Sequence, residues 1–126
     1  MLILKSPSSF ESITDHDILK LVKMQHSQLG DEMFDSVIII EAGDSISDIE
    51  QEIGFSILTN LFDDISYPDP DFVPCFELLK DHGTFYEMLF IFGDGDDAIE
   101  IFIPKHGVDD ELLAMCSQYA VLVPVA

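Results

Sequence analysis

The stretch from Phe90 to Pro104, FIFGDGDDAIEIFIP, restricts the possible folds more than any other part of the chain. Two apolar runs flank five residues of glycine and aspartate, and both residue types tolerate the positive φ angles of tight turns. In the second run, three isoleucines alternate with Glu100 and Phe102, which is typical of a strand with two different faces. We therefore predict a β-hairpin that supplies the two middle strands of a sheet.

The same glycine–aspartate segment raises the alternative of a calcium site, because aspartate oxygens are ligands that calcium prefers. Counted from Asp94, an EF-hand loop needs an oxygen ligand at its fifth position, glycine at the sixth and glutamate at the twelfth. At these positions the chain has Ala98, Ile99 and Lys105. A turn is therefore favoured, and a calcium-binding protein that uses GDGDD or the loop Tyr67–Phe72 stays an alternative hypothesis.

Hydrophobic periodicity and helix-start patterns predict the other elements. We expect Thr14 to cap the first helix, and Ser47 with Glu50 to form a capping box at the second. Gly83 is expected to end a short helix before the hairpin. The predicted elements are a helix over 14–29, a strand over 37–40, helices over 46–63, 75–82 and 108–118, and a strand over 119–125.

Apart from the first helix and the short third one, this order matches the split β-α-β pattern of ferredoxin-like sandwiches. We predict a single α+β domain over residues 1–126, with a ferredoxin-like βαββαβ core and an additional N-terminal helix. Its sheet should have four strands and be mostly antiparallel. Two helices should cover one face, and the N-terminal helix should pack at an edge or over the second face.

Charge is the unusual property of the composition. The chain has 25 acidic and 5 basic residues, a net charge of −20 and no arginine. Because nucleic acids and anionic membranes attract clustered basic side chains, we expect no direct nucleic-acid or membrane binding. The N-terminus resembles no signal peptide, and no apolar stretch approaches the roughly 20 residues that span a bilayer, so we expect a cytoplasmic protein.

The acidic residues are concentrated between Lys23 and Lys80. These 56 intervening residues include 13 acidic side chains and neither lysine nor arginine. A helix N-terminus favours carboxylates in its first turn, which explains some of them but not those that follow the second helix. We predict a partner-binding acidic face formed by Glu41, Asp44, Asp48, Glu52, Asp63, Asp64, Asp69 and Asp71.

Sequence motifs for catalysis, metal or cofactor binding are missing. The four histidines form no HxH, HxxxH or HExxH pattern, and no GxSxG, SxxK, GxxxxGK[ST] or GxGxxG motif occurs. Cys75 and Cys116 lack CxxC spacing, and Cys116 falls on the apolar stripe of a predicted helix, so we expect a buried thiol there. We predict no catalytic residue, no metal site and no cofactor.

These patterns favour a small non-catalytic binding protein that docks on a basic protein surface. It would act as an inhibitor or immunity-type protein, or as a nucleic-acid mimic that presents carboxylates in place of phosphates. The sequence is also compatible with a divalent-cation binding protein, a small hydrolase with a histidine and carboxylates, a structural subunit, or an acidic surface that serves solvation alone.

Overall fold

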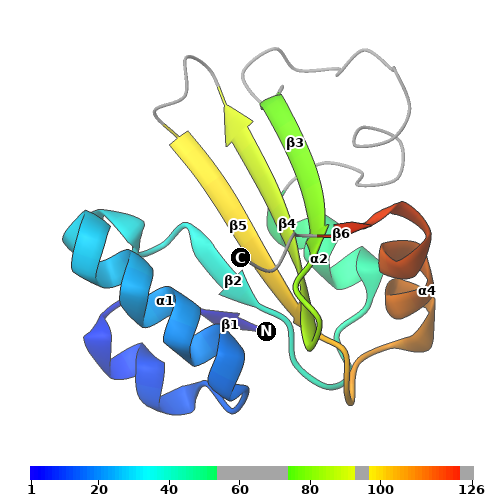
Figure 1. Cartoon of the computed structure of the whole chain (residues 1–126), viewed down its shortest axis with the longest axis horizontal. Coiled ribbons are helices and arrows are strands. Elements are labelled where there is room, and N and C mark those ends of the chain that lie inside the picture. The colour runs from blue at the N-terminus through cyan, green and yellow to red at the C-terminus, as the bar shows by residue number, and fades with distance from the viewer. Residues whose placement is uncertain (54–73, 93–96, 123–126) are drawn as a thin grey trace.

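The computed structural model describes residues 1–53, 74–92 and 97–122 (Figure 1). They form an α+β structure around one mixed sheet. The strands are β1 (Leu2–Ile3), β2 (Val37–Ile39), β3 (Pro74–Asp81), β4 (Phe85–Phe92), β5 (Asp97–Pro104) and β6 (Val121–Leu122). The helices are η1 (Pro7–Ser12), α1 (His16–Leu29), η2 (Gly30–Met33), α2 (Ile46–Ile53) and α4 (Asp110–Tyr119), where η marks 3₁₀ turns.

The central hairpin is confirmed. Strands β4 and β5 pair antiparallel from Phe85↔Pro104 to Phe92↔Asp97, and they occupy the middle of the sheet. The turn between them, residues 93–96, lies outside the described residues, as do residues 54–73 and 123–126. The predicted end of the second helix near residue 63, the loop Tyr67–Phe72 and the last residues of the C-terminal strand therefore lie outside them too.

The ferredoxin-like prediction is not clearly met, and its four-stranded sheet is wrong. The described sheet has six strands in the order β1-β2-β5-β4-β3-β6, and its pairings β2–β5 and β3–β6 are parallel. The final strand lies beside β3 at one edge, while the unpredicted β1 pairs antiparallel with β2 at the other edge. The fold is thus α+β with a mixed sheet.

The predicted short helix over 75–82 is also wrong, because this segment is part of strand β3. It pairs with β4 from Pro74 to Asp81, with an irregularity near its start. Gly83 has φ +103° and stands at the first central position of the two-residue turn to β4, where a type II′ hairpin turn favours glycine. Gly83 therefore belongs to a hairpin turn, which reverses the chain direction, and does not end a helix.

The helix starts differ from the predicted caps by one or two residues. Asp15, not Thr14, caps α1, because its Oδ1 accepts hydrogen bonds from the backbone N–H groups of Asp17 and Ile18. At α2, the side chains and backbone N–H groups of Ser45 and Asp48 hydrogen-bond reciprocally, which is the capping-box arrangement. Gly30 ends α1 with a positive φ of 68°, as predicted.

The two faces of the sheet have separate cores. Helices α2 and α4 cover one face, while α1 and η2 pack on the other (Figure 1). Strand β2 contributes to both cores, with Ile38 in the first and Val37 and Ile39 in the second, which agrees with a strand covered on both faces. Cys116 is a free, buried thiol in the first core.

Candidate functional site

The predicted acidic face begins at the turn between β2 and α2. The carboxylates of Glu41 and Asp44 each lie 2.8 Å from the amino group of Met1, and Asp44 also accepts a 2.9 Å hydrogen bond from the backbone N–H of Glu41. Burial opposes the charged amino group, but the hydrogen bonds and charges of these two carboxylates outweigh it, so its pKa is raised. Asp44 is thus engaged within the molecule, while half of the Glu41 side chain stays exposed.

The other two described residues of the predicted acidic face, Asp48 and Glu52, lie on α2 itself. Asp48 is exposed and bonded to Ser45, whose backbone N–H and hydroxyl lower the pKa of the carboxyl group. Glu52, one turn later, is also exposed. The structure therefore places the first four predicted residues along one short segment. The remaining predicted members lie outside the described residues: Asp63, Asp64, Asp69 and Asp71.

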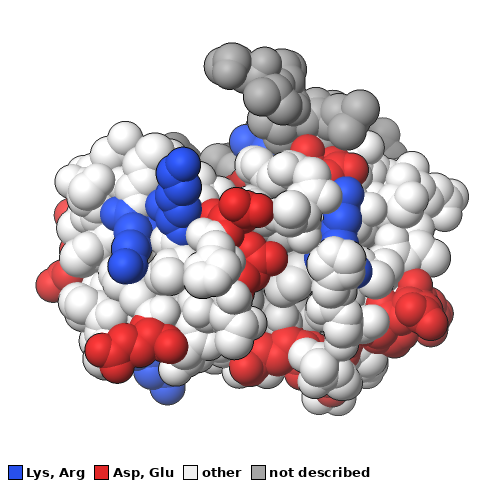
Figure 2. All heavy atoms as spheres, turned by 60° about the horizontal axis from the view of Figure 1, so that its bottom comes forward, with Lys and Arg blue, Asp and Glu red and all other residues white. Residues whose placement is uncertain are grey.

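The described acidic side chains lie on several parts of the face drawn in Figure 2. They form separate patches there, and lysines lie among them. The structure records an ion pair of 2.8 Å between Lys105 and Asp81, next to the β3–β4 turn. Five lysines cannot neutralise 25 carboxylates, so strong negative charge remains across the molecule.

Metal binding finds no support in the described part of the chain, where no group of three or more histidine, cysteine, aspartate or glutamate side chains could hold an ion. The GDGDD turn and the Tyr67–Phe72 loop lie outside that part, apart from Asp97 at the start of β5. The divalent-cation hypothesis therefore stays untested for these two loops. No helix within the described ranges is long and apolar enough to cross a membrane.

The structure reveals a polar cluster that the sequence analysis missed, on the α1 side of the sheet. Glu87 of β4 is only 5% exposed, and its Oε1 lies 2.7 Å from Nε2 of His82. The imidazole ring of His82 in turn stacks on Phe85. Glu100 of β5 stands opposite Leu89, so the two glutamates are diagonal neighbours on one face of the hairpin.

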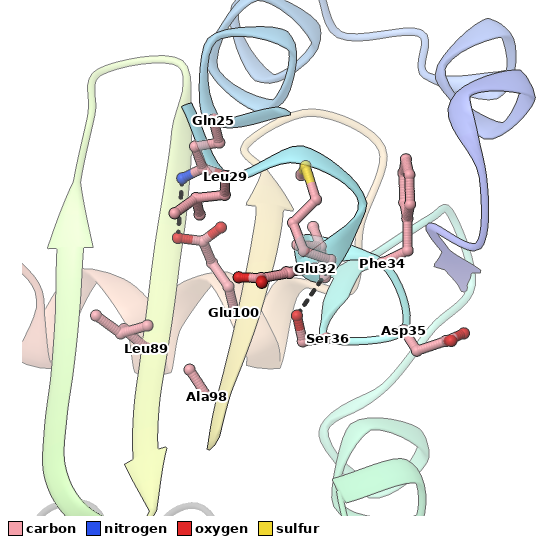
Figure 3. A pocket seen from close by; sticks show the side chains of 11 residues that line it. Gln25, Leu29, Glu32, Phe34, Asp35, Ser36, Leu89, Ala98 and Glu100 are labelled. Atoms are coloured by element: carbon pink, nitrogen blue, oxygen red, sulfur yellow. Dashed lines mark hydrogen bonds between the residues drawn. The ribbon is translucent and has the colours of Figure 1, made fainter. Parts of the chain in front are cut away.

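Glu100 also forms a hydrogen bond with helix α1, which packs on this face of the sheet. Its Oε2 accepts a 3.1 Å hydrogen bond from Nε2 of Gln25 in α1 (Figure 3). Burial raises the pKa of the Glu100 carboxyl to about 8, and the hydrogen bond and negative charge of Glu87 add to this effect. Gln25 and the charge of Lys80 oppose it more weakly. The Glu100 carboxyl group therefore keeps its proton to a higher pH than an exposed glutamate does, and in its protonated form it can donate a hydrogen bond.

A groove of about 570 Å³ opens beside Glu100, between α1 and η2 on one side and β4 and β5 on the other. Glu32 of η2 points toward Glu100, whose carboxyl group is directed at Gln25, while Asp35 points away from both glutamates (Figure 3). Apolar side chains complete much of the wall. The lining residues of the groove are Gln25, Leu29, Glu32, Met33, Phe34, Asp35, Ser36, Val37, Leu89, Ala98 and Glu100.

The sequence contained one sign of this site. Glu87 and Glu100 are the acidic residues at the middle of two strongly apolar strands, FYEMLFIF and DAIEIFIP. An acidic residue on a buried sheet face needs a partner, so two such strands in one hairpin indicate a carboxyl pair. Only the register of the strands, however, shows that the two residues share a face.

Comparison with known proteins assigns no family to the chain. No family model matches it, and neither the curated proteins nor the solved structures include a match. The described residues therefore form an α+β structure with a mixed sheet and an acidic groove beside Glu100, in a chain of strongly negative charge.

Proposed function

We propose that this protein is a non-catalytic binding protein that docks on a basic protein partner through the acidic segment Glu41–Glu52 and the acidic residues that follow it. The partner would be a protein whose cationic surface is covered on binding, as with an inhibitor, an immunity-type protein or a nucleic-acid mimic. The observation that carries the proposal is the net charge of −20 in a chain without arginine. Such a charge steers basic partners and repels polyanions.

The described part of the segment supports this role. Glu41, Asp48 and Glu52 are exposed, and the capping box fixes the backbone at the start of α2. The apolar side of the helix, with Ile49 and Ile53, is buried in the core. The segment therefore presents carboxylates on a helix that is held in place, which reduces the ordering cost of association.

The groove beside Glu100 gives no support to a histidine–carboxylate hydrolase. His82 pairs with Glu87, but neither residue lines the groove, and the groove lining contains no histidine. A histidine–carboxylate hydrolase needs both groups within reach of a bound substrate. A smaller groove of about 230 Å³ does have His106, Asp15 and Glu41 in its lining. Among the described residues, however, no hydrogen bond or ion pair joins His106 to either carboxylate.

The proposal can be tested by immobilising the protein, applying a cell extract at low ionic strength and eluting with a salt gradient. We expect a basic protein to elute, and the purified partner to bind with an association rate that falls steeply with salt. The double variant Glu41→Gln/Glu52→Gln should bind this partner about three- to tenfold more weakly.

The matched control is Glu11→Gln/Glu111→Gln, which makes the same change of net charge at exposed positions elsewhere. This control should leave the affinity nearly unchanged. If no basic protein is retained, the docking function is wrong. If both double variants weaken binding equally, the charge acts diffusely and the Glu41–Glu52 segment is not the contact surface.

A further inference from the structure

We propose that the groove between α1–η2 and β4–β5 binds a small organic cation, an ammonium group carried on a short apolar chain. Its charged end would lie between Glu100 and Glu32, and its apolar part against Leu29 and Leu89. This site is separate from the acidic segment at α2, and the inference does not depend on the docking function.

The size and lining of the groove fit a small molecule. Ligand pockets commonly enclose about 300–1,000 Å³ and combine apolar walls with a few polar groups, and this groove of about 570 Å³ has both. Gln25 and Ser36 provide amide and hydroxyl groups beside the two glutamates. Leu29, 57% exposed on α1, provides apolar surface at the groove.

The negative charge of the groove predicts a positively charged ligand. Each ionisable residue in its lining is acidic, namely Glu32, Asp35 and Glu100. An anion would also meet the net charge of −20 of the whole chain. A bare metal ion fits poorly, because no metal-binding group occurs among the described residues and much of the wall is apolar. An organic cation matches both the charged and the apolar parts.

Protonation of Glu100 makes this binding depend on pH. Glu87, Gln25 and the positive charge of Lys80 act on Glu100. Glu32 points toward Glu100 from η2, and His82 binds Glu87. When the ammonium group binds, the Glu100 carboxyl becomes a carboxylate and its proton passes to the solvent. Burial and Glu87 favour the proton at neutral pH, so the cation competes with it.

The probe for the experiment is n-hexylamine, with 1-hexanol as a neutral compound of the same chain length. We expect hexylammonium to shift the backbone amide resonances of Gln25, Ser36, Leu89 and Glu100 in a titration followed by NMR. The affinity should rise between pH 6.5 and 8, by at most about tenfold per pH unit, because one proton is released. Calorimetry in two buffers of different ionisation enthalpy should detect that proton.

The variant Glu100→Gln keeps the shape of the protonated carboxyl group but cannot ionise, so it should lose both the proton release and the pH dependence. At pH 8 it should bind hexylammonium at least tenfold more weakly. Glu32→Gln, which alters the opposite wall and leaves the pair intact, should weaken binding but keep the proton release. Glu11→Gln, an exposed residue outside the groove, should change neither.

Three results would overturn the proposal. The first is the absence of resonance shifts at millimolar hexylamine, and the second is equal binding of hexylamine and hexanol. The third is an equal loss of affinity in Glu11→Gln and Glu100→Gln, which would indicate diffuse attraction by the acidic surface. Circular dichroism of each variant separates a loss of binding from a loss of folding, and Glu32→Gln tests the site even if Glu100→Gln is unstable.

Discussion

Alternate residues of the same strands build the two faces of the sheet, yet the faces differ in polarity. On the side of α2 and α4, strands β4 and β5 place Met88, Phe90, Ile101 and Ile103 in a continuous apolar core. On the side of α1, the same strands carry Glu87 and Glu100 between apolar neighbours. Among the described residues, helices α2 and α4 cover the first face, while α1 and η2 leave a groove over the second.

This difference shows how partial cover allows ionisable groups to lie within a sheet. A carboxyl group under complete apolar cover would cost several kcal/mol if it were charged and unpaired. At the edge of α1, Glu100 instead reaches Gln25 and the groove, and Glu87 reaches His82. The open face can therefore hold functional groups, while the closed face provides stability.

The comparison predicts its largest effect for neighbouring residues of β4 that point to opposite faces. Met88 is fully buried against α2 and α4, whereas Leu89 is half-buried at the groove. Met88→Ala should lower the free energy of unfolding by about 2–5 kcal/mol, and Leu89→Ala by about 1 kcal/mol. Urea unfolding of both variants measures the two values, and equal losses would contradict the proposed difference between the faces.

The second prediction concerns pH. The native pKa of Glu100 is about 8, above the ordinary value of 4.5, so the native state retains a proton that the unfolded state releases. Stability should therefore fall as pH rises from 4.5 to 8, by at most about 1.4 kcal/mol per pH unit from this group, and its contribution should level off above pH 8.

Glu100→Gln removes this contribution together with its coupling to Glu87, while the titrating groups farther away stay the same. Urea unfolding at pH 5.5, 6.5 and 7.5 should show a steeper decline for the wild type than for the variant. Glu11→Gln should follow the wild type. Parallel curves for wild type and Glu100→Gln would show that Glu100 holds no extra proton in the native state.

The smallest effect is expected at the start of α1, which covers the polar face. Asp15→Ala removes the acceptor for two backbone N–H groups and should cost about 1 kcal/mol of unfolding free energy. Thr14→Ala, at the exposed neighbouring position that the sequence suggested as the cap, should cost much less. Thermal or urea unfolding distinguishes the two, and a larger loss for Thr14→Ala would contradict the observed cap.

The same contrast explains how much the sequence predicted. The β4–β5 hairpin was predictable because turn residues and flanking apolar runs lie next to each other in the chain. Strand β3 was missed because Phe76, Leu79 and Lys80 suit a helix as well as a strand, and its pairing with β4 decides between them. The short strand β1 forms only by pairing with β2, more than thirty residues later.

For the candidate site too, the sequence predicted the features that depend on residues close together in the chain. The sequence predicted one acidic segment because its four described members are close in the chain. The structure places Glu41 and Asp44 in the turn before α2, and Asp48 and Glu52 on the helix. The contact of Gln25 with Glu100 joins residues 75 positions apart, which no local pattern contains. Sites made by strand register and helix packing need the tertiary structure.

The order of the strands also has a consequence for how the chain folds. Strands β3, β4 and β5 follow one another and pair with their neighbours, so this meander requires only short loop closures. Strand β2 reaches β5 across about sixty residues, and loop closure of that length is a slow step in folding. We therefore expect the meander to form the early nucleus, and the groove under α1 to be completed only when the N-terminal third of the chain docks onto it.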